Sequence, residues 1–183
     1  MPNHVKNVLK FKNLKSKDDI DFILNMIASP GVCLPTDPIE VVEWNIDFNK
    51  IIKEPEDIAD CPTEYIMTGS EHVEKLEDKP WFNWYDWHID HWGTKWRAYD
   101  CYTKIGRTYI TFVFSTAWSM PEPICKRLAI LGYNMEIRYA DEDLGHNCGV
   151  LEYDTEQGWA GCDEDSYQIK DPYKFAYNLW NKY

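Results

Sequence analysis

The sequence lacks the short motifs that mark common catalytic sites. GxSxG, the P-loop pattern, GxGxxG and HExxH are all missing. Each of these motifs holds a nucleophile, a phosphate group or a metal ion in a defined backbone setting. Without any of them, the sequence predicts no catalytic residue and leans toward a protein that is not an enzyme.

Long apolar runs and clustered cysteines are lacking as well. The first twelve residues, MPNHVKNVLKFK, are too polar for a signal peptide, and no apolar run approaches the length that spans a membrane. No CxxC pair occurs, which excludes the usual iron–sulfur and zinc-ribbon spacings. We therefore expect reduced thiols, a cytoplasmic location, no membrane partner and no cofactor. The widely spaced cysteines are Cys33, Cys61, Cys101, Cys125, Cys148 and Cys162.

Basic residues are few. The chain has 19 Lys and Arg against 31 Asp and Glu, which gives a net charge of -12. Such a chain repels phosphate backbones, so the charge argues against a nucleic-acid partner, although lysines at 6, 10, 12, 15 and 17 make the N-terminus locally basic. No Lys or Arg lies between Arg138 and Lys170, and this acidic stretch favours a basic partner.

Aromatic residues, in contrast, are abundant. They make up 15% of the chain, and six of the nine tryptophans fall between Trp81 and Trp118. We expect a helix from Trp81 to Trp92 that is broken by Gly93, followed by a return toward a strand at residues 108–114. Large rings bury much area, so this stretch should anchor the core.

The N-terminal part reads as strand, helix, strand. Residues 4–12 alternate apolar and basic side chains, which is typical of a half-buried strand. Ser16 is a candidate N-cap for a helix that ends near Ala28. A strand is predicted over residues 39–48 and a short helix over residues 70–77.

The later part reads as strand, helix, strand, strand. Ser119 to Glu122 resembles a capping box, and Gly132 suits the end of the helix that it starts. The strands at 108–114 and 133–139 should therefore be parallel and adjacent, with a right-handed crossover. An antiparallel strand over 147–153 and, after an acidic loop, a C-terminal helix over 171–180 follow.

These elements predict one α+β domain with a ferredoxin-like plan. We expect a mostly antiparallel sheet, helices packed on one face and a Trp-rich insertion. The expected parts are an N-terminal half at 1–48, the insertion at 49–107, a second half at 108–155, and an acidic loop with a helix at 156–183.

Four segments in order also resemble one known family. They are PNHVKN at the start, DFNKII at 47–52, WGTKWRAYD at 92–100 and FSTAWSMPEPI at 114–124. Together they are similar to the YubB ferredoxin-like family of bacteriophages and conjugative plasmids, over roughly residues 2–155. The resemblance implies a ferredoxin-like α+β fold and a mobile-element protein acting inside a bacterial host. It transfers no catalytic residue.

The sequence alone allows two alternative hypotheses for a binding site. The first is an acidic interface for a basic protein, such as a host defence nuclease or another nucleic-acid-handling protein. It would consist of Asp141, Glu142, Asp143, Asp163, Glu164 and Asp165. The second is a small-molecule or metal pocket beside the aromatic helix. It would be lined by Trp84, His88, His91, Trp96 and Tyr99.

Each site has a plain structural alternative. A run of acidic residues in a hairpin usually serves only to keep the hairpin soluble. Tryptophans around a turn such as Gly93 usually pack over one face of a sheet. His88 and His91 are one helical turn apart, but no third ligand can be named, so no metal site is predicted. Lys95 stands between two tryptophans, where a cation–π contact is expected.

Overall fold

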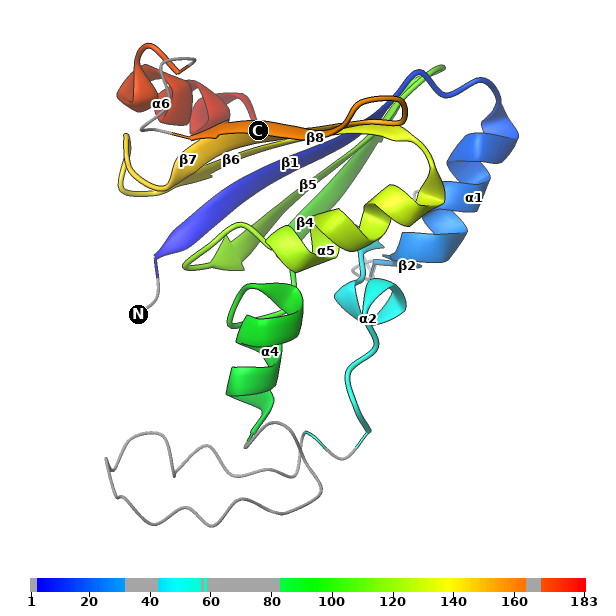
Figure 1. Cartoon of the computed structure of the whole chain (residues 1–183), viewed down its shortest axis with the longest axis horizontal. Helices are drawn as coiled ribbons and strands as arrows, with labels where there is room; N and C mark the ends of the chain where they lie inside the picture. Colours follow the sequence, from blue (N-terminus) through cyan, green and yellow to red (C-terminus); the bar gives the residue numbers. More distant parts are fainter. Residues whose placement is uncertain (1–2, 32–42, 57, 59–82, 164–168) are drawn as a thin grey trace, which may run out of the picture.

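The middle strand of the fold is β1 (His4–Lys12), which has neighbours on both sides. In the computed structural model, which describes residues 3–31, 43–56, 58, 83–163 and 169–183, six strands form one antiparallel sheet in the order β4-β5-β1-β6-β7-β8. The sheet curves across the upper half of Figure 1. The other strands of this sheet are β4 (Tyr99–Ile105), β5 (Ile110–Ala117), β6 (Asn134–Asp141), β7 (Cys148–Asp154) and β8 (Gly158–Asp163).

The ferredoxin-like plan is confirmed, with one correction to its strand pairing. β1 is followed by α1 (Lys17–Ile27), and β5 leads through α5 (Glu122–Leu128) to β6. β1 pairs antiparallel with both β5 and β6, so those two strands are parallel to each other but separated by β1. The prediction that they are adjacent is wrong, because the N-terminal strand occupies the gap that the crossover leaves.

The second strand of the N-terminal half lies within the predicted segment, but it does not join the main sheet. In the described residues, the strand predicted over 39–48 is only β3 (Trp44–Ile46), which pairs with β2 (Ala28–Pro30) in a separate two-stranded sheet. Asp47 accepts a hydrogen bond from Asn49 N and begins helix α2 (Phe48–Ile51). β4, which no pattern indicated, completes the main sheet beside β5. The helix predicted over 70–77 lies outside the described residues.

Helix ends agree with the sequence in most places. Ser16 and Asp19 form a capping box at α1, and Asp171 caps α6 (Pro172–Lys182) with proline in its first turn. The box predicted at Ser119 is wrong, since its hydroxyl donates to the Gly93 carbonyl and α5 begins without a side-chain cap. A short 3-10 helix, η2 (Ala129–Leu131), follows α5 and ends at Gly132 as predicted.

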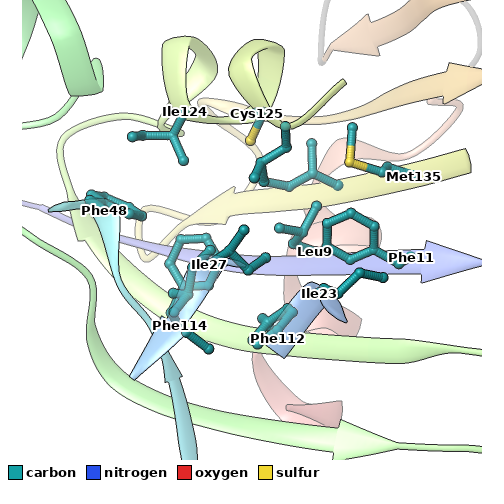
Figure 2. Packing of buried hydrophobic residues seen from close by; sticks show 14 of the residues in the cluster. Leu9, Phe11, Ile23, Ile27, Phe48, Phe112, Phe114, Ile124, Cys125 and Met135 are labelled. Carbon is teal, nitrogen blue, oxygen red and sulfur yellow. The ribbon is translucent and has the colours of Figure 1, made fainter. Parts of the chain in front are cut away.

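One face of the sheet carries the main core. Leu9 and Phe11 of β1, Phe112 and Phe114 of β5, and Met135 of β6 meet side chains from α1, α2 and α5, as Figure 2 shows. Every one of these five side chains is 2% exposed or less. α1, α2 and α5 all lie on this side of the sheet in Figure 1.

The opposite face is covered by α6. Val8 and Val113 of the sheet pack with Ala176 and Leu179 of the helix in a second, smaller core. Trp180 Nε1 donates to the carbonyls of Ala140 and Asp141, which ties the helix to the end of β6. Helices were expected on one face of the sheet only, but α6 covers the other face as well (Figure 1). β8 also adds an edge strand where an acidic loop was expected.

Candidate functional site

The aromatic helix is α4 (Trp84–Trp92), and it enters the core at its C-terminal end. Asn83 caps it by accepting from Asp86 N at 3.0 Å, and Gly93 ends it in the left-handed conformation. Trp87 and Trp92 are 2% and 0% exposed, and Trp92 Nε1 donates to the Ile52 carbonyl at 3.0 Å. The inner side of this helix is thus structural.

His88 is the most enclosed polar group of the helix. It is 7% exposed and stacks on Trp92 with ring centres 4.1 Å apart. Its Nδ1 lies 2.8 Å from the Lys95 carbonyl, and its Nε2 lies 2.7 Å from Glu54 Oε1. His88 therefore joins three segments of the chain rather than lining an open pocket.

Glu54 is held ionised by its two partners. Burial alone would raise the pKa of Glu54, but hydrogen bonds from Arg97 and His88, with their charges, lower it below the ordinary value. The Glu54 side chain is 12% exposed, and Arg97 Nη2 binds its second oxygen. The carboxylate is thus a structural counterion.

His91 stacks on a different ring from the one that His88 contacts face to face. It stacks parallel to Trp87 at 4.5 Å, and its Nδ1 lies 3.0 Å from the Trp87 carbonyl. In the described part of the chain, no three His, Cys, Asp or Glu side chains are arranged to hold a metal ion. The two histidines stack on different tryptophan rings, His88 on Trp92 and His91 on Trp87.

An aromatic cluster with exposed tryptophans lies beside the helix, and we call it the cation cage. It consists of Tyr85, Trp96 and Trp118 around the ammonium group of Lys95. The Lys95 Nζ lies 5.7, 5.3 and 4.9 Å from the three ring centres, respectively. Trp96 is 37% and Trp118 40% exposed. The expected cation–π contact of Lys95 is thus present and involves three rings instead of one or two.

Trp118 adopts a backbone conformation that bulky residues rarely take. Its φ is +72°, in the left-handed region. Trp118 N donates to the Asn3 carbonyl at 3.0 Å, and Asn147 Nδ2 donates to the Trp118 carbonyl at 2.8 Å. Strain of this kind persists only where surrounding contacts maintain it, and it is concentrated at functional sites.

The turn between β6 and β7, residues 141–147, lies next to the cation cage; we call it the acidic turn. Asn147 links it to Trp118, as described above. Glu142 N donates to the His4 carbonyl at 2.9 Å, and the Glu142 carboxylate accepts from His4 N through Oε1 at 2.9 Å. The ring of His4 packs against Tyr99, which in turn packs against Trp96. The acidic turn and the cation cage therefore share one end of the sheet.

The predicted acidic residues have unequal roles in the structure. Asp141 is 5% exposed, and its carboxylate accepts from Asn3, Asn147 and the amide of Asp143, so it stabilises the turn and cannot contact a partner. Glu142 and Asp143 are exposed. The backbone of Asp163 pairs with Gly149 in β8, whereas Glu164 and Asp165 lie outside the described residues.

The predicted aromatic pocket is divided rather than assembled. Trp84 and His88 face the core side, while Trp96 lies at the surface. Tyr99 is the first residue of β4, and its hydroxyl donates to the Thr116 carbonyl of β5 at 3.1 Å. Burial, with Asp100 and Glu142 nearby, raises the pKa of Tyr99 to about 12, so its hydroxyl stays protonated. Sequence reasoning missed Tyr85 and Trp118, which no local spacing connects.

A cavity of about 420 Å³ lies on the other face of the sheet, beside the start of α6. Glu136, Arg138 and Val150 form part of its floor, and Lys170 and Phe175 part of its wall. Burial favours the neutral acid, but hydrogen bonds from Lys12 and Arg138 lower the pKa of Glu136 to about 2. The charges at the cavity floor are thus largely paired with one another.

The basic N-terminal segment is also engaged within the protein. Lys6 lies over Trp180 at 5.0 Å and Lys10 over Tyr109 at 4.6 Å. Lys12 binds Glu136 and Glu152 at 2.8 and 2.9 Å. The contacts of these three lysines leave little support for a phosphate-binding strip along β1. Among the described helices, none is both long and apolar enough to cross a membrane.

Comparison with known proteins supports the fold. A family model described as a ferredoxin-like domain in Api92-like protein matches residues 91–175, from the end of α4 to the first turn of α6. No curated protein and no solved structure gives a match. The matched segment includes the split strand–helix–strand unit of β5, α5 and β6 as well as the acidic turn. The chain therefore contains a domain that is similar to the ferredoxin-like domains of Api92-like proteins.

Proposed function

We propose that this chain is a non-enzymatic binding protein whose partner is a basic protein. Its docking surface would combine the exposed tryptophans of the cation cage with Glu142 and Asp143 of the acidic turn. Tryptophan and tyrosine are enriched among residues that dominate binding energy, and flanking acidic groups steer a basic partner. The observation that carries the proposal is the strained Trp118, held exposed beside an acidic turn by two hydrogen bonds.

The charge of the whole chain supports this class of partner. A net charge of -12 accelerates encounter with a basic surface and disfavours encounter with nucleic acid. A groove that binds DNA or RNA is basic, and an acidic protein can occupy it. We therefore propose a nucleic-acid-handling protein of a bacterial host, such as a defence nuclease, as the partner. The resemblance to phage and plasmid proteins supports an accessory protein that acts in the host cytoplasm.

The alternative of a small-molecule or metal pocket at the aromatic helix has less support. His88 uses both ring nitrogens on groups within the chain, and the ring of His91 is stacked on Trp87. A ligand at this place would have to displace contacts that hold the core together. A surface role for the same helix requires no such change.

The proposal is tested by reversing charge at one end of the sheet only. The test variant is Glu142→Lys/Asp143→Lys. The matched control is Asp21→Lys/Glu156→Lys, which makes the same charge change on α1 and in the β7–β8 turn, away from the acidic turn. Tagged wild type and both variants are used to capture proteins from bacterial lysate at low and high salt.

We expect wild type and control to retain the same basic protein and the test variant to lose it. With the purified partner, the test variant should bind about tenfold more weakly at low salt, and the difference should shrink as salt rises. If all three proteins capture the same set with the same salt dependence, the acidic turn is not part of a docking surface.

A further inference from the structure

We infer that the cation cage is a recognition site for an organic cation, and that Lys95 is its resident occupant. This inference rests on the proposed function in one respect, because the natural ligand would be a lysine or arginine side chain of the basic partner. That side chain would take the place of the Lys95 ammonium between Tyr85, Trp96 and Trp118. Rings that surround a cation on several sides are the arrangement by which proteins recognise ammonium groups.

The three rings form a preorganised receptor because they come from separate, well-anchored segments. Tyr85 is on α4, and Trp118 follows the end of β5. The two rings meet edge to face with centres 5.9 Å apart. Trp96 makes a similar contact with Tyr99 at 6.3 Å. Tyr85 and Trp118 therefore support each other and Trp96 packs against Tyr99, and neither ring contact involves the Lys95 side chain.

The backbone beneath the cage is fixed independently of the Lys95 side chain. Thr94 Oγ1 donates to the Ala117 carbonyl at 2.7 Å and accepts from Ala117 N at 3.1 Å. The Lys95 carbonyl accepts from buried His88. These bonds join the two segments that present Trp96 and Trp118. The Lys95 side chain can leave the cage while the backbone on both sides of it stays where it is.

Among the described residues, the printed contacts of the Lys95 ammonium group are with the rings of Tyr85, Trp96 and Trp118. In the described part of the chain, no carboxylate pairs with it. A cation–π contact near the surface is weak, and an ammonium group that moves into water regains its hydration. Replacement of Lys95 by another cation is thus a near-balanced exchange. Glu142 and Asp143 on the same end of the sheet raise the local concentration of cations and bias the exchange toward an incoming one.

The test uses choline as the probe, because it carries a quaternary ammonium group. The control probe is 3,3-dimethylbutan-1-ol, which has the same shape without the charge. Wild type, Lys95→Ala and Lys95→Ala/Trp118→Ala are titrated with each compound, and the indole Nε1–H resonances of ¹⁵N-labelled tryptophan are followed. Urea denaturation of all three proteins verifies that they are folded.

Removal of the Lys95 side chain should open the cage. We expect Lys95→Ala to bind choline at least about tenfold more tightly than wild type does, since the internal competitor is gone. The uncharged alcohol should cause no saturable shift, and the added Trp118→Ala change should abolish binding of choline. If choline and the alcohol act alike, or if Lys95→Ala binds no better than wild type, the inference is overturned.

The result can be separated from the fate of the proposed function. Tighter choline binding together with unchanged lysate capture by the Glu142→Lys/Asp143→Lys variant would support the cage and refute the basic-protein docking surface. Loss of capture without a choline response would support the docking surface and refute the cage.

Discussion

Glu54 shows how one carboxylate can organise the base of the aromatic helix. One of its oxygens lies 2.7 Å from His88 Nε2, and the other binds Arg97. The side chain comes from the segment that follows α2, whereas its partners lie on α4 and just after it. A carboxylate that is 12% exposed needs such compensation, because burying a charge without a partner is costly.

Replacing Glu54 tests this role through its pH dependence. We expect Glu54→Gln to lower the free energy of unfolding at pH 7 by about 2 kcal/mol, since charge-assisted hydrogen bonds are lost. The pKa of Glu54 is lowered in the folded state, so its contribution is complete above the ordinary value of 4.5 and disappears as the pH falls through the folded value. The difference between variant and wild type should therefore shrink below pH 4.5 in urea denaturation.

The neighbouring Glu56 provides the control for that measurement. Its side chain is 89% exposed and pairs with Lys53 at 3.0 Å. Glu56→Gln should change stability by less than about 0.5 kcal/mol at any pH, because exposed ion pairs contribute little. An equal loss for both variants would show that Glu54 acts only through general surface charge.

At the scale of the elements, Gly93 ends α4 and lies directly against Pro123 in the first turn of α5. Gly93 N donates to the carbonyls of His88 and Ile89, and its φ of +75° ends the helix. A Cβ placed on Gly93 would lie 2.6 Å from Pro123 Cδ. The close approach and the left-handed conformation both require glycine at this position. The turn therefore sets where the cation cage lies relative to α5.

A pair of glycine substitutions separates those two requirements. Gly132 also has a left-handed backbone, with φ of +71°, but no atom lies within 4 Å of a Cβ built there. Gly132→Ala should cost about 1 kcal/mol from backbone strain alone, and Gly93→Ala about 2 to 4 kcal/mol because a steric overlap is added. Urea denaturation measures both. Equal costs would indicate that Pro123 moves aside freely and that α4 and α5 are not tightly coupled.

At the scale of the whole molecule, β1 holds the fold together. It pairs along its length with β5 and β6, and it contributes side chains to the cores on both faces. β4 and β8 are the edges of the sheet, and β4 has an irregular register between Tyr99 and Tyr102. Local opening should therefore begin at the edges and reach β1 last.

Hydrogen exchange provides the test of that order. Amides of β1 with partners in β5 and β6 should exchange only through global unfolding, at least about a hundredfold more slowly than those of β8. Exchange is followed residue by residue by NMR under native conditions. If β8 amides are protected as strongly as those of β1, the hairpin of β7 and β8 belongs to the most stable part of the domain, and the predicted order of opening is wrong.

Patterns confined to one segment predicted their elements well. The alternation of apolar and basic side chains predicted β1, and Ser16 predicted the start of α1. Asp171 with Pro172 predicted the start of α6. The box at Ser119 failed because a nearby carbonyl, that of Gly93, took its hydroxyl. The candidate site was predicted only in part: Trp96 and Lys95 were named, but Trp118 joins them from a strand end 22 residues after Trp96, and no spacing rule covers that distance.

By itself, the sequence determined the class of the fold, the position of the aromatic helix and the acidic character of the chain. These properties depend on local hydrophobic periodicity, on caps and on composition, which are all written in neighbouring residues. Tertiary structure decided that β1 separates β5 from β6, that Asp141 is enclosed, and that the acidic turn lies beside Trp118. Those outcomes depend on which distant segments pack together, and packing energy is shared among residues that no short stretch of sequence contains.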